Sequence, residues 1–216
     1  MPRAQRVFDV IGAAAGLAVF APVMAVIAVA VLIDDGGPVL FRQERVGRER
    51  MPFRILKFRS MRDGRITRVG RLLRATGLDE VSQLFNILRG DMSAVGPRPL
   101  TADDVARLGW ASSAFDFRWK CRPGLTGLAQ LLGAHANDHA LPLDRVHADQ
   151  WSPLLDCQLI AWSFAVNAFG KARIRRWLWV YYPARVSNFL LPLRPAYTHE
   201  SSTACRVFVD AESTER

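Results

Sequence analysis

The chain is built around residues 77–99, which read GLDEVSQLFNILRGDMSAVGPRP. Four apolar residues recur there at i, i+3, i+4 and i+7, the spacing of an amphipathic helix. These residues are Val81, Leu84, Phe85 and Leu88. Glycines stand before and after this pattern, at positions 77 and 90, where the left-handed backbone that caps a helix has little steric cost. The pattern therefore predicts one helix between the two glycines.

Two carboxylates, Asp79 and Glu80, fall in the first turn of that helix. Unpaired backbone N–H groups and the positive end of the helix dipole stabilise anions there and favour phosphate binding. Downstream, Arg98 lies between two prolines, which stiffen the turn that carries its guanidinium. The simpler interpretation is that Asp79 only caps a helix and that Arg98 is a turn residue in solvent.

The positive charge of the chain is concentrated in one segment. The 216 residues carry a formal net charge of +9, and residues 36–75 hold twelve Lys or Arg against three acidic residues. Such a block indicates a polyanion, an anionic lipid or a phosphorylated substrate as its partner. The three cysteines have no metal-site or disulfide spacing, which favours a reducing compartment.

Residues 10–33 form an uncharged run of 24 residues, long enough to cross a bilayer as a helix. A signal peptide would have a shorter apolar core. A single span conflicts with the basic residues on both flanks, because the positive-inside rule keeps both ends in the cytoplasm. Pro22 lies in the middle of the run, and Gly12 and Gly16 would let two arms approach closely. A re-entrant helix that turns back at Pro22 is favoured over the span.

The basic segment predicts short strands at 39–41 and 53–58 and a turn at Asp63 and Gly64. A second amphipathic helix is expected at 66–75, with four apolar residues facing inward and a ridge of arginines beside them. The inward residues are Ile66, Val69, Leu72 and Leu73, and the arginines are Arg65, Arg68, Arg71 and Arg74.

The remaining sequence predicts a helix capped by Thr101, a loop at 133–142 and an apolar helix at 156–169. His135 and His139 are four residues apart, but without a third ligand nearby they are interpreted as loop residues. Basic residues followed by tryptophans and tyrosines, from Lys171 onward, favour a helix in the lipid headgroup layer over a buried helix. A loose tail is expected from Tyr197.

Four blocks together resemble the bacterial sugar transferase family, the monotopic polyprenol-phosphate phosphoglycosyl transferases. The first is the apolar run broken by Pro22. The others are GGPVLFRQERVGR with FRILKFRSM (36–48 and 53–61), LRATGLDEVSQLFNILRGDMSAVGPRPL (73–100) and RPGLTGLAQ (122–130). The resemblance extends over residues 3–165 and is to the small, minimal-core members. The segment between Met61 and Ile66 is shorter than the family's.

The resemblance implies an α+β, mostly helical fold. A re-entrant membrane helix (1–35) precedes a compact cytoplasmic catalytic domain with a short β-hairpin (36–170) and an interfacial basic and aromatic helix with a tail (171–216). The implied reaction moves a phosphosugar from a nucleotide diphosphate sugar, such as a UDP-sugar, to polyprenol phosphate in the bacterial inner membrane. Nucleoside monophosphate is released, which starts the synthesis of a polysaccharide or glycoconjugate. A homodimer and contacts with later glycosyltransferases are further expectations.

The resemblance also assigns roles to residues. Asp79 and Glu80 match the family's catalytic pair, and Arg74 and Arg98 match its phosphate-binding arginines. Lys57 and Arg59 are assigned to the same phosphates, and Arg122, Thr126 and Gln130 to the nucleotide.

From residue chemistry, Asp79 is the expected nucleophile, and Mg²⁺ held by Asp79 and Glu80 offsets the repulsion between anions. The division between metal binding and general-base catalysis by Glu80 is left open. Two other functions compete with the enzyme: a membrane-tethered nucleic-acid binder, which would place two carboxylates against a polyanion, and a non-catalytic scaffold.

Overall fold

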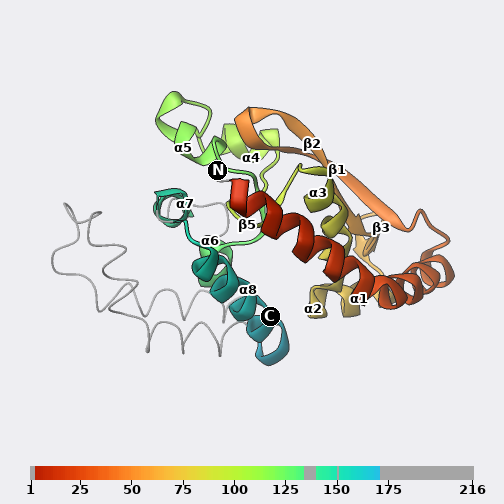
Figure 1. Ribbon diagram of the computed structural model, residues 1–216. Coiled ribbons are helices and arrows are strands. Elements are labelled where there is room, and N and C mark those ends of the chain that lie inside the picture. Colours follow the sequence, from red (N-terminus) through yellow and green to blue (C-terminus); the bar gives the residue numbers. More distant parts are fainter. Residues whose placement is uncertain (1–2, 134–139, 150, 171–216) are drawn as a thin grey trace, which may run out of the picture. The chain divides into compact units, whose positions relative to one another are not determined.

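The computed structural model describes residues 3–133, 140–149 and 151–170 of the chain. This part is mostly helical and contains a small β-hairpin, as the sequence predicted (Figure 1). The predicted headgroup-layer helix, the tail, His135 and His139 lie outside the described residues.

Helix α1 (Arg3–Asp35) contains the whole apolar run and stays helical through Pro22. It is long and apolar enough to cross a membrane. Figure 1 shows its ribbon bending in the second half, which agrees with the hydrogen bond that a proline removes. The backbone is thus a bent helix, and the re-entrant topology stays a prediction.

One side of α1 packs against the rest of the domain. Ala13 is 3% exposed and belongs to a core cluster with Ile55, Ile87 and Met92. A Cβ atom added to Gly16 would lie 3.1 Å from a methyl group of Leu84. Of the two glycines predicted to bring two arms of α1 together, Gly16 therefore faces helix α3 (Leu84–Arg89), whereas a Cβ atom at Gly12 would have no neighbour within 4 Å.

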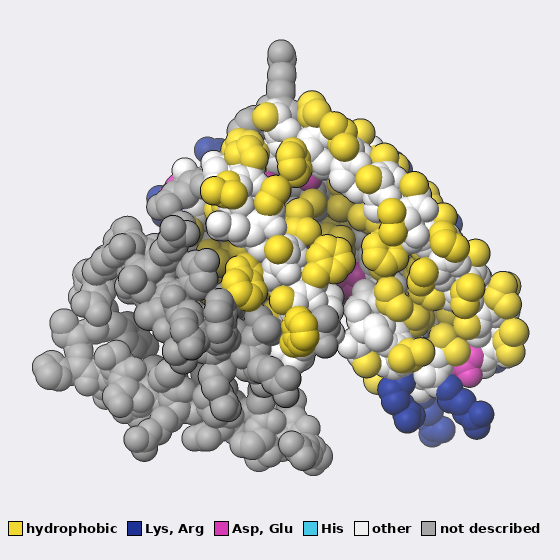
Figure 2. Space-filling view, turned by 60° about the horizontal axis from the view of Figure 1, so that its bottom comes forward, with side chains coloured by type: hydrophobic (Ala, Val, Ile, Leu, Met, Phe, Trp, Pro, Cys, Tyr) yellow, Lys and Arg dark blue, Asp and Glu magenta, His cyan; other side chains and the backbone are white. Residues whose placement is uncertain are grey.

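The other side of α1 is exposed and apolar, and helix α8 (Pro153–Phe169) adds exposed phenylalanines to the apolar surface. Figure 2 shows these side chains gathered on one face of the molecule. On α1 the exposed residues are Val7, Phe8, Ile11, Val19, Val23, Val26, Val29, Leu32 and Ile33; on α8 they are Leu154, Phe164 and Phe169.

Strands β1 (Leu40–Val46) and β2 (Pro52–Phe58) form an antiparallel hairpin in which Leu40 pairs with Phe58 and Val46 with Pro52. A single 3-10 turn, η1 (Arg48–Arg50), lies in the connection. The first strand extends five residues further at its C-terminal end than the sequence predicted. The prediction stopped early because the second half of the strand is polar. Charged residues are common on such edge strands, whose outer side is in solvent.

A tight turn at Asp63 and Gly64 joins β3 (Met61–Arg62) to β4 (Arg65–Ile66), as predicted. Helix α2 (Arg68–Thr76) then begins at Thr67, whose side chain accepts a hydrogen bond from the backbone of Gly70. Two of the four predicted inward residues were assigned wrongly: Ile66 is 47% exposed and Leu72 is 63% exposed. Ile66 belongs to the strand before the helix, and α2 buries a narrower face than its apolar pattern predicted.

The stretch between Gly77 and Gly90 is helical, and both glycines have the expected left-handed backbone, with φ of 72° and 94°. However, its first half is a 3-10 helix, η2 (Leu78–Gln83), which precedes α3. The most buried face is not the apolar stripe, because Phe85 is 44% exposed whereas Asn86 is fully buried. The side chain of Asn86 hydrogen-bonds the backbone of β2 at Leu56 and Arg54. This polar face is buried because it meets the hairpin.

Strand β5 (Ser93–Val95) pairs in parallel with β6 (Gly124–Thr126). Short helices lie between β5 and β6 in the sequence and after β6: α4 (Ala102–Arg107), η3 (Ser113–Phe115), α5 (Asp116–Trp119), α6 (Leu128–Leu132) and α7 (Ala140–Asp149). Helix α4 begins at the predicted Thr101, which forms a capping box with Asp104. Val95, Leu131, Leu159 and Val166 form the core cluster beneath α8.

Candidate active site

Strand β2 lies against η2, and this contact brings the first two site residues together. The ammonium group of Lys57 donates to a carboxylate oxygen of Glu80 at 2.5 Å. The two side chains are 21% and 32% exposed, so water reaches the pair and screens it only in part. Lys57 therefore holds Glu80 on the hairpin side of the helix.

Asp79 is half-buried at the start of the same helix. Burial raises the pKa of its carboxyl group, and the neighbouring carboxylate of Glu80 raises it further. Lys57 and Arg74 act in the opposite direction and lower the pKa. A partly desolvated carboxylate between cations is a suitable nucleophile, because it is weakly hydrated and remains ionisable.

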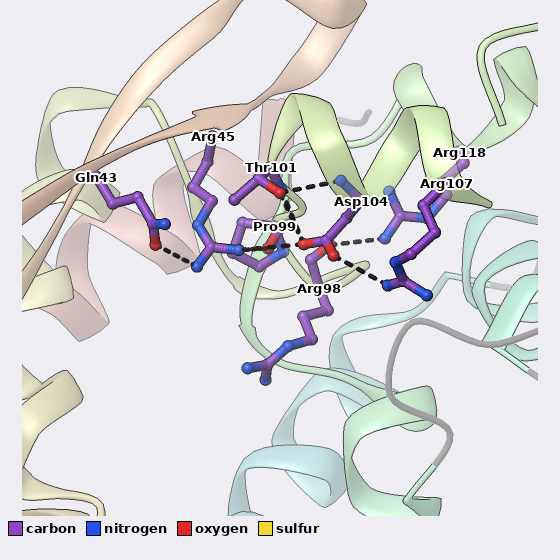
Figure 3. Close-up of polar contacts among 8 residues, drawn as sticks. All are labelled: Gln43, Arg45, Arg98, Pro99, Thr101, Asp104, Arg107 and Arg118. Carbon is purple, nitrogen blue, oxygen red and sulfur yellow. Dashed lines mark hydrogen bonds and ion pairs between the residues drawn. The ribbon is translucent and has the colours of Figure 1, made fainter. Parts of the chain in front are cut away.

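The turn that carries Arg98 is held by its backbone (Figure 3). The carbonyl oxygen of Arg98 accepts a hydrogen bond of 2.6 Å from Arg118, and that of Pro99 accepts one of 3.1 Å from Arg45. In Figure 3 the guanidinium of Arg98 extends away from these contacts, and within the described residues no hydrogen bond or ion pair engages it. Backbone hydrogen bonds thus hold the turn that carries Arg98, and the guanidinium of Arg98 is unpaired within the described residues.

Arg118 is 4% exposed, and its charge is compensated by Asp144 of α7 at 2.8 Å. Its guanidinium also lies over the rings of Trp110 and Trp119, 5.3 and 4.9 Å from their centroids. Burial raises the pKa of Asp144, whereas Arg118 lowers it. Asp144 and the two tryptophans thus hold Arg118 in place, and Arg118 donates the hydrogen bond to the carbonyl of Arg98.

Glycines allow the Arg98 turn to approach the RPGLTG segment closely. The backbone N–H of Gly124 donates to the carbonyl of Pro97 at 2.8 Å, and that of Gly96 donates to Thr126 at 2.9 Å. A Cβ atom at Gly96 or Gly124 would collide with the backbone of the other segment. Any larger residue would therefore push the two segments apart.

These segments enclose a cleft, which contains several predicted site residues: Lys57, Glu80, Arg98 and Gln130. The rest of its lining is Arg45, Ile55, Gln83, Pro99, Gly124 and Leu125. Gln83 is 2% exposed and its side-chain nitrogen has no partner within the described part of the chain. The oxygen of Gln130 is likewise buried without a partner there. The cleft thus offers cations and unpaired amide groups to a polar ligand.

Two predicted phosphate ligands lie outside the cleft lining. Arg59 pairs with the buried carboxylate of Asp35 at 2.8 Å and donates to the carbonyl of Gly37, so it closes the end of α1. Arg74 is exposed and donates to the sulfur of Met61 at 3.1 Å, while its charge still acts on Asp79. The structure therefore gives Arg59 a structural contact and leaves Arg74 beside the carboxylates.

Two of the predicted nucleotide ligands are engaged within the protein. Arg122 donates to the carbonyl of Gly90 at 2.9 Å, and the hydroxyl of Thr126 is hydrogen-bonded to that of Ser163. Gln130 reaches the carbonyl of Gly124 at 3.5 Å and is the one of the three that lines the cleft.

Sequence reasoning did not identify Arg45, Gln83 and Arg118 as site residues. Arg45 belongs to the VGR-containing block that carries the resemblance, and Gln83 lies one turn after the carboxylates. Arg45 and Gln83 could therefore have been identified from their neighbours in the sequence. Arg118 contacts the turn from 20 residues away, and no local pattern indicates that pairing.

The residues fit a magnesium ion in their chemistry. Among the described residues no cluster of three metal-binding side chains is found. Mg²⁺ commonly binds one or two carboxylates together with substrate phosphates, so two adjacent carboxylates are sufficient. Asp79 and Glu80 repel one another, as the raised pKa of Asp79 shows, and a bound cation would relieve that repulsion.

The chain is similar to several named bacterial proteins. A protein of Caulobacter vibrioides, named UDP-glucose:undecaprenyl-phosphate glucose-1-phosphate transferase, is 42% identical over 72% of this chain and 66% of its own length. The exopolysaccharide production protein ExoY of Rhizobium meliloti is 35% identical over 73% of this chain and 82% of its own length. An Escherichia coli protein with the same name as the Caulobacter one is 34% identical over 78% of this chain.

The chain spans only 41% of that Escherichia coli relative and somewhat under two thirds of the Caulobacter one. The sequence model of one family, described as bacterial sugar transferase, matches residues 2–170, which include α1, the hairpin, the carboxylates, the Arg98 turn and α8. The chain belongs to the bacterial sugar transferase family.

Proposed function

We propose that this protein transfers a phosphosugar from a nucleotide diphosphate sugar, specifically a UDP-sugar, to polyprenol phosphate. The observation that carries the proposal is that Glu80 lines a cleft together with Lys57, Arg45 and Arg98, and that Asp79 directly precedes Glu80 in the same helix. Family membership and the names of the relatives support the same reaction.

The reaction begins with attack by a carboxylate oxygen of Asp79 on the phosphorus that carries the sugar. A bond forms between that oxygen and phosphorus, and the bond to the bridging oxygen breaks, so that nucleoside monophosphate leaves with the electron pair. An oxygen of polyprenol phosphate then attacks the same phosphorus and displaces Asp79. The products are polyprenol diphosphate sugar and regenerated enzyme.

The cationic side chains reduce the repulsion between the reacting anions. Arg74 and Lys57 act on Asp79, and Arg98 extends a free guanidinium into the cleft. Because the Arg98 turn is held by backbone contacts, its charge needs little reorganisation during the reaction. Asp79 and Glu80 would hold Mg²⁺, which supplies further positive charge at the phosphates when bound.

Helix α1 supports a membrane location for this chemistry. Its exposed side is apolar, and its other side packs against α3, which follows the carboxylates directly. We therefore place the protein in the cytoplasmic leaflet of the bacterial inner membrane with its site at the headgroup level. There the acceptor phosphate already lies, and the apolar tail of the polyprenol stays in the lipid.

The test uses the full chain in lipid nanodiscs with polyprenol phosphate and a panel of UDP-sugars. Release of UMP and formation of a lipid-linked product are both measured. Asp79→Asn should abolish both, because an amide forms no acyl phosphate, while its melting temperature stays close to the parent's. The matched control is Asp103→Asn, since Asp103 is exposed in the first turn of α4. Equal activity of Asp79→Asn and the parent would exclude the covalent route.

A further inference from the structure

Two guanidinium groups, those of Arg45 and Arg98, line the cleft. Arg45 reaches Arg98's turn from β1, 54 residues away, and both side chains line the cleft. The hydrogen-bond acceptors of Arg45 are neutral: the side-chain oxygen of Gln43 at 2.5 Å and the carbonyl of Pro99 at 3.1 Å. The carboxylate nearest to Arg45 is Asp104, at 3.9 Å.

Asp104 is also committed to other groups. Its oxygens accept hydrogen bonds from the side chains of Thr101 and Arg107, at 2.9 and 3.0 Å (Figure 3). Its attraction is therefore divided between two cations, Arg45 at 3.9 Å and Arg107 at 3.0 Å.

The unmet hydrogen-bonding capacity of the pair points to an anion. The Nε group of Arg45 is buried without a partner in the described chain, and the guanidinium of Arg98 has none there either. Burial lowers the pKa of Arg45, and the charge of Arg98 lowers it further. Two like charges in a partly buried cleft destabilise one another, and a bound dianion would reverse that cost.

The pair lines the same cleft as Glu80, which directly follows the expected nucleophile Asp79 in the sequence. Lys57 of β2 is bound to Glu80 at 2.5 Å, whereas Arg45 of β1 is bound to the carbonyl of Pro99 at 3.1 Å, so these two cations are attached to different parts of the lining. A diphosphate whose sugar-bearing phosphorus faces Asp79 can thus place its second phosphate at the guanidiniums.

We propose that Arg45 is a substrate-binding residue that, together with Arg98, holds the phosphate of the leaving nucleoside monophosphate. This inference rests on the proposed function and adds a residue to it. When the bond to the bridging oxygen breaks, the departing phosphate gains negative charge, and paired guanidiniums stabilise it. The same contacts bind free nucleoside monophosphate after the reaction, so product inhibition reports on the pair.

The experiment compares Arg45→Gln with Arg42→Gln, a control on the same strand whose side chain is exposed. The inhibition constant of UMP and the values of kcat and KM for the UDP-sugar are measured in nanodiscs. We expect Arg45→Gln to weaken UMP inhibition about 10-fold or more and to lower kcat/KM about 100-fold, the usual range for a lost charged donor. Arg42→Gln should stay within about 2-fold of the parent.

Because Arg45 also contacts Pro99, the variant Arg45→Lys separates binding from folding. Lysine keeps the charge but loses the planar fork, so UMP inhibition should weaken by a few-fold at an unchanged melting temperature. Unchanged UMP inhibition in a folded Arg45→Gln or Arg45→Lys protein would overturn the assignment. If the parent chain released no UMP from any UDP-sugar, the proposed function would fail instead. Calorimetric binding of UMP to the same variants would then still decide the role of Arg45.

Discussion

The substitution Arg118→Met tests how far the Arg98 turn depends on its buried support. Arg118 and Asp144 are 3% and 4% exposed at their side chains, and they form an ion pair of 2.8 Å. Removal of one partner leaves a buried charge without compensation, which costs about 3–5 kcal/mol of unfolding free energy. Domains of this size are stable by about 5–15 kcal/mol, so the variant loses a large fraction of its stability.

The same substitution removes the donor to the carbonyl of Arg98. A hydrogen bond from a charged group contributes about 1.5–3 kcal/mol, which corresponds to roughly 10- to 100-fold in rate if the transition state depends on it fully. The two effects are separated by the double substitution Arg118→Met with Asp144→Leu. Apolar replacement of a whole buried pair is often neutral or stabilising, so the double variant should regain stability.

The assay combines urea unfolding with UMP release in nanodiscs, and Arg145→Met is the control, since Arg145 is 62% exposed. We expect the double variant to unfold like the parent but to keep a 10- to 100-fold lower kcat, in the range given by the lost charged hydrogen bond. Rescue by Arg118→Lys should be partial, because lysine supplies a donor without the guanidinium plane. Full recovery of kcat in the double variant would show that Arg118 acts only through stability, and the positioning argument would be refuted.

The pH dependence of Arg118→Met follows from Asp144. Burial raises the pKa of this carboxyl in the folded state, and loss of Arg118 removes an influence that lowers it. A group whose folded pKa lies above its unfolded value stabilises the fold below the unfolded pKa and loses that contribution as the pH rises. Urea midpoints should therefore show a stability deficit, relative to the parent, that grows as the pH rises above the usual range of aspartate and Asp144 is forced to ionise.

Four further predictions follow from individual residues. Turnover should fall on acidification with a midpoint above the usual range of aspartate, because Asp79 has a raised pKa; a pH–rate profile flat down to about pH 4 would contradict this. Arg98→Ala should lower kcat about 100-fold or more, and a loss of only a few-fold would make Arg98 structural. Gly124→Ala should lower both the melting temperature and activity, since its Cβ meets backbone at Gly96. Single cysteines at residues 3 and 42 should be labelled only from the cytoplasm. The substitution Pro22→Leu should shift the cysteine at residue 3 toward the periplasm. Periplasmic labelling at residue 3 in otherwise unchanged protein would exclude the re-entrant topology.

Features set by neighbours in the sequence could be predicted, and features set by distant contacts could not. Gly77, Gly90 and Thr101 end or begin helices through bonds within a few residues, and the structure has them as expected. Ile66 and Leu72 follow a helical period, yet both are exposed: Ile66 belongs to the strand before α2, and Leu72 lies outside the narrow face that α2 buries. Arg118 was missed because its role depends on Asp144 of α7 and on Trp110, which lie outside its own helix, as well as on its neighbour Trp119.

The helical stretch that begins with Asp79 and Glu80 contacts both the apolar helix α1 and the strand β2 that carries Lys57. Its apolar residues Leu84 and Leu88 pack against α1 at Ala13, and Leu84 meets Gly16. Its polar face carries Asn86, which binds the backbone of β2, the strand that supplies Lys57 to Glu80.

The helical stretch therefore packs on two partners, with its leucines against α1 and Asn86 against β2, and does not face a single core. A shift of α1 along its axis would be transmitted through the Leu84 contact to the start of the helix, because close-packed interfaces deform little. In the proposed membrane arrangement, the height of Asp79 above the lipid would be fixed by the same contacts that attach the apolar helix to the domain.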